Sequence, residues 1–223
     1  SAHDLTLSIS SLGEIQKAQL VILLGNDVEP RMAKAVSVLP KNRIIRVLDL
    51  PSLRFNLEPH LLNHAHQRDP HVWLDPQNGN LIAHAIQDRL GAKRQNIIAE
   101  TEILRLRSIL SPYAKSRYLT HHDAFSHFSR GFGLSSGLSI RDASGGQTGA
   151  RSQYLLRKNA LQSGVQCVFV EPQYGHKDAQ GIAQSLNLPI INIDPRGMSQ
   201  SLIDKGYEQF MQRLVAQFRA CFG

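Results

Sequence analysis

Short runs rich in β-forming residues alternate along this chain with longer segments of helical period. This alternation is typical of an α/β protein in which helices connect mainly parallel strands. Strands are expected at Leu20–Leu24, Ile44–Leu48, Arg117–Thr120, Val165–Val170 and Pro189–Ile193. Helices are expected at Ser10–Ala18, Glu29–Val38, Gln77–Leu90, Lys93–Leu110, Ala124–Gly131, Gly149–Ser163, Lys177–Leu186 and Ser201–Phe218. No repeat or low-complexity tract interrupts the pattern. With 223 residues, of which 42% are hydrophobic and 19% charged, the chain can bury a real core.

The predicted helices between Gln77 and Leu110 have no strand between them, so they can connect two α/β lobes. We therefore expect an N-terminal lobe over residues 1–76, linking helices over 77–115 and a C-terminal lobe over 116–223. Each lobe would hold only a few strands. Apolar periodicity fails in two stretches, a proline-containing surface loop between Leu50 and Pro70 and a Gly/Ser-rich, mobile loop from Ser135 to Gly149.

The chain carries a formal charge of +7, which brings nucleic acid into consideration as a partner. Its Lys and Arg residues are scattered, and no aromatic stacking motif lies among them, so a basic solvated surface explains them better. No apolar run approaches the roughly 18 residues that cross a bilayer, and the N-terminus lacks the features of a signal peptide. We expect a soluble chain without membrane insertion or nucleic-acid binding, whose signal, if it is exported, has been removed.

Polar residues that can bind metals follow three of the predicted strands. His121, His122 and Asp123 come directly after one strand, Glu171 after the next and Asp194 after the last. In open α/β sheets, ligands bind beyond the carboxyl ends of the strands, so these side chains form a candidate site.

Two further histidines complete the candidate ligand set. His71 heads a run that ends in the rigid turn Asp75-Pro76, and His3 stands beside Asp4 at the start of the chain. Three neutral imidazoles and one carboxylate suit tetrahedral Zn²⁺, whereas Mn²⁺ is better served by more oxygen ligands. The residues alone leave metal binding as one interpretation, because isolated histidines are more often surface or hydrogen-bonded residues.

The two cysteines are far apart in the sequence. Cys167 lies in an apolar run, and Cys221 lies almost at the C-terminus. They are either a disulfide, which implies an oxidising compartment, or two buried thiols that never meet.

Several motifs resemble one family along nearly the whole chain. They are "AHDLTLS", "IQKAQLVILLGNDVE", "HVWLDPQN", "HHDAFSHFSRGFGL", "GARSQYLLRKNALQSGVQCVFVEPQ" and "INIDPRG", in this order. Together they resemble the substrate-binding proteins of bacterial zinc/manganese ABC importers, in particular the zinc-specific ZnuA type (cluster A-I). The resemblance implies two α/β lobes joined by helix, with the metal held in a cleft between them.

Carried over onto this chain, the resemblance implies that His3, His71 and His122 are metal ligands, with Asp194 or water in the fourth position. His122 is preferred over His121 because it directly precedes Asp-Ala-Phe. Manganese-type relatives tend to place a glutamate there, so the histidine favours zinc.

The resemblance also suggests roles for residues beyond the ligands. Asp123 and Glu171 either accept the outer N–H of a ligating imidazole or are a helix cap and a sheet-end carboxylate. Zinc-type relatives can join the strand before Glu-Pro-Gln to the C-terminal end, which implies a Cys167–Cys221 disulfide and supports a periplasmic location.

The functional expectation is a monomeric, non-enzymatic periplasmic protein that captures Zn²⁺ and delivers it to an inner-membrane ABC permease. Alternatives are a metal-binding adaptor without a transport role and a zinc hydrolase with Glu171 as general base. Relatives carry another β and α segment ahead of the His3 motif, so we expect either that this sequence is a piece of a longer chain or that its N-terminal lobe is reduced. His60, His64 and His66 resemble a shortened His-rich loop, although solvated loop residues are the alternative interpretation.

Overall fold

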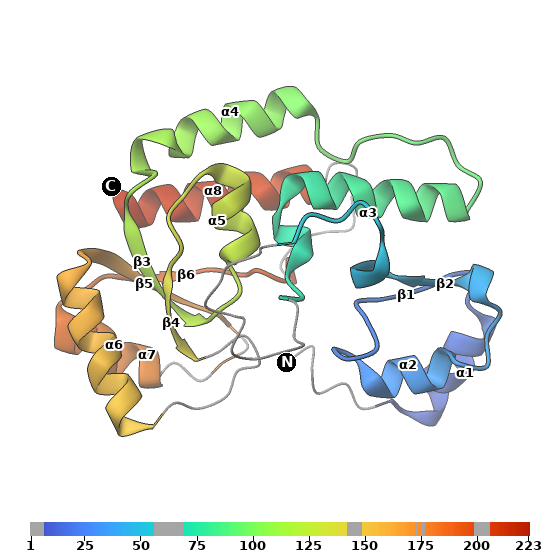
Figure 1. Ribbon diagram of the computed structural model, residues 1–223, viewed down its shortest axis with the longest axis horizontal. Coiled ribbons are helices and arrows are strands. Elements are labelled where there is room, and N and C mark those ends of the chain that lie inside the picture. Colours follow the sequence, from blue (N-terminus) through green and yellow to red (C-terminus); the bar gives the residue numbers. More distant parts are fainter. Residues whose placement is uncertain (1–6, 56–68, 142–148, 173, 175–176, 199–205) are drawn as a thin grey trace. The chain divides into compact units, whose positions relative to one another are not determined.

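The computed structural model describes residues 7–55, 69–141, 149–172, 174, 177–198 and 206–223 (Figure 1). The chain folds into two compact units. One consists of Ser1–Trp73 and Gln77–Asn96, and the other of Leu74–Pro76 and Ile97–Gly223. The two helices that were expected to link the lobes are divided between them: most of α3 (Pro76–Arg89) belongs to the first unit and α4 (Glu100–Leu110) to the second.

The first unit is built on two parallel strands, β1 (Val21–Leu23) and β2 (Ile44–Arg46). Helices α1 (Ile9–Lys17) and α2 (Pro30–Val36) bury apolar side chains in one cluster with both strands. A second cluster contains Ile45 of β2 and two isoleucines of α3, so helices cover both faces of this small sheet. Short 3-10 turns occur at Lys41–Arg43, Val47–Asp49 and Val72–Leu74.

Local sequence signals explain where the first helices begin. The side chain of Ser8 accepts a hydrogen bond from the backbone N–H of Ser11 and so caps α1. Pro30 starts α2, where its missing N–H costs nothing.

The second unit contains a four-stranded parallel sheet in the order β4-β3-β5-β6. The strands are β3 (Arg117–His122), β4 (Leu138–Arg141), β5 (Val165–Val170) and β6 (Ile190–Asn192). The helices are α4, α5 (Ser126–Phe132), α6 (Ala150–Gln162), α7 (Lys177–Leu186) and α8 (Gly206–Phe222), with a 3-10 turn at Ser111–Tyr113.

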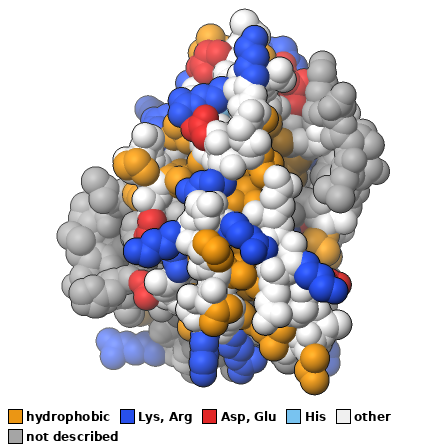
Figure 2. Space-filling model, turned by 90° about the vertical axis from the view of Figure 1, so that its right-hand side faces the viewer, with side chains coloured by type: hydrophobic (Ala, Val, Ile, Leu, Met, Phe, Trp, Pro, Cys, Tyr) orange, Lys and Arg blue, Asp and Glu red, His pale blue; other side chains and the backbone are white. Residues whose placement is uncertain are grey.

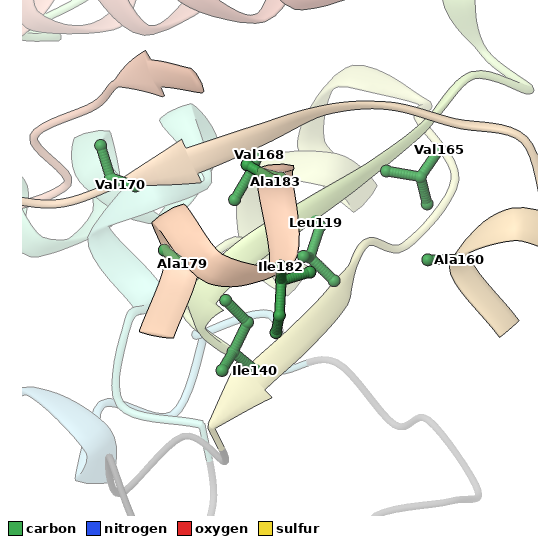
Figure 3. Close-up of a cluster of buried hydrophobic side chains, with 9 residues drawn as sticks. All are labelled: Leu119, Ile140, Ala160, Val165, Val168, Val170, Ala179, Ile182 and Ala183. Atoms are coloured by element: carbon green, nitrogen blue, oxygen red, sulfur yellow. The ribbon is translucent and has the colours of Figure 1, made fainter. Parts of the chain in front are cut away.

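Each face of this sheet has its own core. Aliphatic side chains of the strands pack with those of α6 and α7, as Figure 3 shows for nine buried residues between Leu119 and Ala183. Aromatic rings mark a second cluster, in which Phe218 of α8 lies 4.4 Å from Phe128 of α5 and 4.6 Å from Phe169 of β5, measured between ring centroids. The sheet is therefore held between two helical layers, and its strand ends are fixed in place.

The structure confirms the α/β class, the mainly parallel sheets and all five predicted strands. A first correction concerns a sixth strand. Leu138–Arg141 was expected to lie in a mobile Gly/Ser-rich loop, but these residues form β4, which pairs with β3. Ile140 is buried in the core of the sheet. The ring of Tyr118 occupies the space that a Cβ at position 137 would need, so Gly137 admits the close packing that precedes the strand.

A second correction concerns the start of α4. The helix was expected from Lys93 but begins at Glu100. The side chain of Gln87 binds the backbone of Gln95 twice, and Arg94 forms an ion pair with Asp88, so residues after α3 are held against the end of that helix instead.

The disulfide implied by the resemblance is present. Cys167 of β5 and Cys221 of α8 are bonded, with Cα atoms 5.4 Å apart and a sequence separation of 54. Both cysteines are buried. The bridge ties the C-terminal helix to the centre of the sheet.

Charged side chains are spread over the surface. Figure 2 shows Lys and Arg side chains among uncharged and hydrophobic ones on the side that faces the viewer, with acidic side chains between some of them. Among the helices that the structure describes, none is long and apolar enough to span a membrane.

Candidate metal site

His122 ends β3, and Glu171 follows the end of the neighbouring strand β5. Because the two strands are parallel and adjacent, their carboxyl ends meet at one edge of the sheet. There the Nδ1 atom of His122 contacts a carboxylate oxygen of Glu171. Both side chains are almost fully buried, with 4% and 0% of their surfaces exposed. The structure thus contains a buried carboxylate–histidine pair at a strand end.

The ring of Tyr174 packs against the histidine of this pair and against its neighbour His121. Its ring centroid lies 5.1 Å from that of His122 and 4.7 Å from that of His121. His121 is also buried. The tyrosine therefore packs against both histidines and limits the positions that their rings can take.

A second carboxylate–histidine pair lies in the first unit. Nδ1 of His71 lies 2.7 Å from Oδ1 of Asp69, and the backbone N–H of His71 donates to the same oxygen over 3.0 Å. The imidazole is 10% exposed, and its ring centroid lies 5.3 Å from that of Trp73. This ring is therefore oriented by a charge, a turn and an aromatic neighbour together.

The two pairs have the same chemical consequence. An ionised carboxylate can only accept hydrogen bonds, so Nδ1 of a neutral imidazole beside it carries the proton. The lone pair of that tautomer lies on Nε2, which is the atom that then coordinates a metal. Carboxylates in this position fix the ring and make it a stronger ligand. The donor chemistry of His71 and His122 therefore fits Zn²⁺.

Asp194 lies beyond the end of β6, the strand next to β5. Its Oδ1 accepts the backbone N–H of Arg196 over 3.0 Å in a tight turn. Asp123 follows His122 directly and is half-buried. Helix α5 begins three residues later, at Ser126, and Phe125 is its N-cap residue.

The remaining predicted ligands lie outside the described residues. These are His3 and the loop histidines His60, His64 and His66. Among the residues that the structure does describe, it brings together no group of three or more His, Cys, Asp or Glu side chains that holds a metal. His71 and His122 belong to different units.

Sequence reasoning missed two residues here, Asp69 of one pair and Tyr174, which packs against the other pair. Asp69 stands two residues before His71 in an Asp-Pro-His run, and an aspartate that bonds the backbone two residues on is a known turn signal. Tyr174 stands three residues after Glu171, and its backbone N–H donates to the Glu171 carbonyl in another turn. Both turns could have been predicted from the sequence, but neither turn indicates a metal site on its own.

Solved structures with the same fold cover almost the whole chain. The periplasmic zinc-binding protein TroA from Treponema pallidum matches with a TM-score of 0.81 and 18% identity, over 100% of this chain and 87% of that one. The laminin-binding protein Lmb of Streptococcus agalactiae matches with a TM-score of 0.80 and 21% identity, over 97% and 87%. The chain thus has the same α/β fold as these two proteins.

Sequence comparison narrows this class to one family. Residues 1–221 match the family described as ZnuA, zinc-uptake complex component A, periplasmic. The high-affinity zinc uptake system protein ZnuA of Haemophilus ducreyi is 27% identical over 99% of this chain and 83% of its own length. That of Yersinia pestis is 25% identical over 99% and 81%. The chain belongs to the ZnuA family, a family of zinc-binding, periplasmic transport components rather than enzymes.

Proposed function

We propose that this protein captures Zn²⁺ in the periplasm and delivers it to an ABC permease in the inner membrane. The observation that carries the proposal is the pair of carboxylate-backed histidines, Asp69–His71 in one unit and Glu171–His122 in the other. A histidine that is only part of a core does not need a carboxylate on its ring N–H. A metal-ligating histidine almost always donates its outer N–H to a carboxylate, a backbone carbonyl or water, and here two histidines each have a carboxylate.

The proposed ligands are His71 and His122 through Nε2, together with His3 and either Asp194 or water. Asp69 and Glu171 accept the outer N–H of the two imidazoles, and Asp123 is proposed to assist beside His122. Nitrogen ligands in this number suit Zn²⁺ better than Mn²⁺, which prefers oxygen.

Two further features support capture and delivery in the periplasm. The relatives that match are named as zinc uptake proteins. The Cys167–Cys221 disulfide persists in an oxidising compartment. The proposed working form is a monomer, which binds zinc alone and meets its permease only for transfer.

Zinc titration by calorimetry tests the site. We expect one Zn²⁺ per chain, and a loss of affinity of about 100-fold or more in His71→Ala and in His122→Ala, since each removes a ligand. His84→Ala is the matched control, because it removes a histidine from the middle of α3. Unchanged affinity in the two ligand variants would contradict the proposal.

Acid provides a second check on histidine ligation. Imidazoles bind zinc only when deprotonated, so binding releases protons and affinity falls between about pH 7.5 and about pH 5.5. A flat profile would exclude histidine ligands. Binding weaker than about micromolar by the folded protein would instead favour the adaptor alternative.

Delivery needs its own measurement. Zinc uptake into vesicles that contain the cognate permease and an energised ATPase should rise when the zinc-loaded protein is added, and should not rise with the His122→Ala variant. Equal uptake with free zinc would argue against a delivery role.

A further inference from the structure

The segment Leu74–Pro76 belongs to the second unit, although Trp73 and Gln77 on either side of it belong to the first. The chain therefore leaves the first unit after Trp73, is held by the second unit for three residues, and returns at the start of α3. His71 stands only three residues before this segment. A chain of that length reaches at most about 11 Å, so the place of the segment restricts the place of the histidine.

A buried ion pair holds the segment. The carboxylate of Asp75 has no exposed surface and lies 3.0 Å from Nη2 of Arg130 on α5, whose side chain is 26% exposed. A buried carboxylate is costly unless it is paired, so Asp75 is strongly bound to this position. The ion pair fixes the segment to α5.

Two more contacts restrict the backbone of the segment. The hydroxyl of Tyr207 on α8 lies 3.5 Å from the carbonyl oxygen of Asp75, a long hydrogen bond. Burial, and then the negative charge of Asp75, raise the pKa of Tyr207 above its ordinary value, so the hydroxyl keeps the proton that it donates. At position 131, an added Cβ would lie 3.1 Å from Cδ of Pro76, so Gly131 allows α5 to pack closely there.

We propose that Asp75, Arg130, Gly131 and Tyr207 form a clasp that positions His71 for zinc binding. These are positioning residues: none is a proposed ligand, and each acts through the segment that leads to the imidazole. The inference rests on the proposed function, because it assumes that His71 is a ligand. Ligand geometry has to be held to within about 0.5 Å, and a short tether fixed by a buried ion pair supplies such a restraint.

The test compares three clasp variants with a matched control. Arg130→Met removes the ion pair, Tyr207→Phe removes only the hydroxyl, and Gly131→Ala crowds Pro76 without changing charge. Arg105→Met is the control, since it removes an arginine–carboxylate pair from α4 in the same unit. Zinc affinity, the visible spectrum of the Co²⁺-loaded protein and hydrogen exchange of the zinc-free protein are measured for each.

We expect Arg130→Met to weaken zinc binding by about tenfold or more and to change the Co²⁺ spectrum, which reports ligand geometry. Gly131→Ala and Tyr207→Phe should produce smaller changes of the same kind, and Arg130→Lys should restore part of the affinity. In the zinc-free protein, backbone exchange should rise at His71–Trp73 in each clasp variant. Arg105→Met should leave zinc affinity, the Co²⁺ spectrum and backbone exchange at His71–Trp73 unchanged.

If the clasp has only a structural role, its variants will have lower thermal stability, but the folded variants will keep the zinc affinity and the Co²⁺ spectrum of the wild type. That result would overturn the proposal. If Arg130→Met does not fold, the milder Gly131→Ala and Tyr207→Phe variants decide in the same way. Normal zinc binding by His71→Ala would instead defeat the proposed function. In that case, hydrogen exchange at His71–Trp73 in the clasp variants still tests whether the clasp holds His71. Unchanged exchange in those variants would overturn the clasp proposal.

Discussion

One carboxylate oxygen of Asp69 accepts hydrogen bonds from both the backbone N–H and the ring of His71. The bond to the backbone sets where the residue sits, and the bond to Nδ1 sets how its ring is turned. The negative charge has a separate effect, because it makes Nε2 a better donor to a metal. These two contributions, geometry and charge, can be separated by substitution.

Asp69→Asn separates them, because asparagine keeps an acceptor oxygen but loses the charge. We expect zinc affinity to fall by about tenfold, which is less than the loss in His71→Ala, while the fold is unchanged. The measurement is a zinc competition titration against a chelator. Asp88→Asn, an exposed position on α3, is the control for lost charge in the same unit. Equal affinities for the two asparagine variants would show that the Asp69 charge does not act on the metal.

The sequence predicts some of the contacts between individual side chains and not others. His122 and Glu171 were placed together because parallel strands bring their carboxyl ends to one edge, a rule that needs only strand positions. The contact between Asp75 and Arg130 joins residues 55 apart in sequence and depends on how α5 packs, which no local pattern encodes. Single residues are thus predictable where topology alone brings them together.

Helices α4 and α8 are joined by a charged hydrogen-bond network around Glu102. Arg105 donates to both carboxylate oxygens over 2.7 and 2.6 Å, and Gln212 of α8 donates over 2.7 Å. The hydrogen bonds from Arg105, against the opposing effect of burial, lower the pKa of Glu102 from its ordinary value of 4.5 to about 2. The network therefore contributes to stability only while the carboxylate is ionised.

Glu102→Gln tests this link between the two helices. A carboxyl with a lowered pKa in the folded state stabilises the fold above its unfolded pKa, and that contribution is lost as pH falls from about 4.5 towards about 2. We expect the variant to be less stable by about 1 kcal/mol at pH 7, since the arginine is largely exposed, and equal to the wild type near pH 2. Urea denaturation over a pH series measures the difference. A stability gap between Glu102→Gln and the wild type that stays constant over the pH series would contradict the argument.

The sequence-based prediction of helices and strands was wrong at β4 and at the start of α4, where contacts with the rest of the fold outweighed local composition. The four residues of β4 are flanked by Gly and Ser, so a window average reads them as a loop, although Leu138 and Ile140 alternate as strand residues do. Residues 93–99 have helical composition, yet side chains at the end of α3 hold them out of a helix. Most of the longer elements, whose apolar period spans two or more turns, were predicted correctly, and the start of α4 is the exception.

For the whole chain, alternation of strands and helices was enough to predict the α/β class and its division into two parts. The path of the chain between the parts was not predictable. Leu74–Pro76 carries no composition that assigns it to the second unit, and its place follows from the partners of Asp75. A division of the sequence into consecutive segments cannot represent a chain that crosses between units more than once.

The Cys167–Cys221 disulfide allows a prediction about how stability is distributed over the molecule. Both of its ends lie in the second unit. Closing a loop of 54 residues removes unfolded-state entropy worth up to about 4 kcal/mol. The double variant Cys167→Ala/Cys221→Ala should lose stability of this order, and reduction of the wild type should have the same effect.

The loss should be confined to one unit. Hydrogen exchange in the double variant should accelerate in β5 and α8 but not in β1 and β2, because the bridge constrains only the second unit. Zinc affinity should change little in the folded variant, since neither cysteine is itself a proposed ligand. Faster exchange in both units would mean instead that the two unfold together, and the bridge would then stabilise the whole molecule through one cooperative transition.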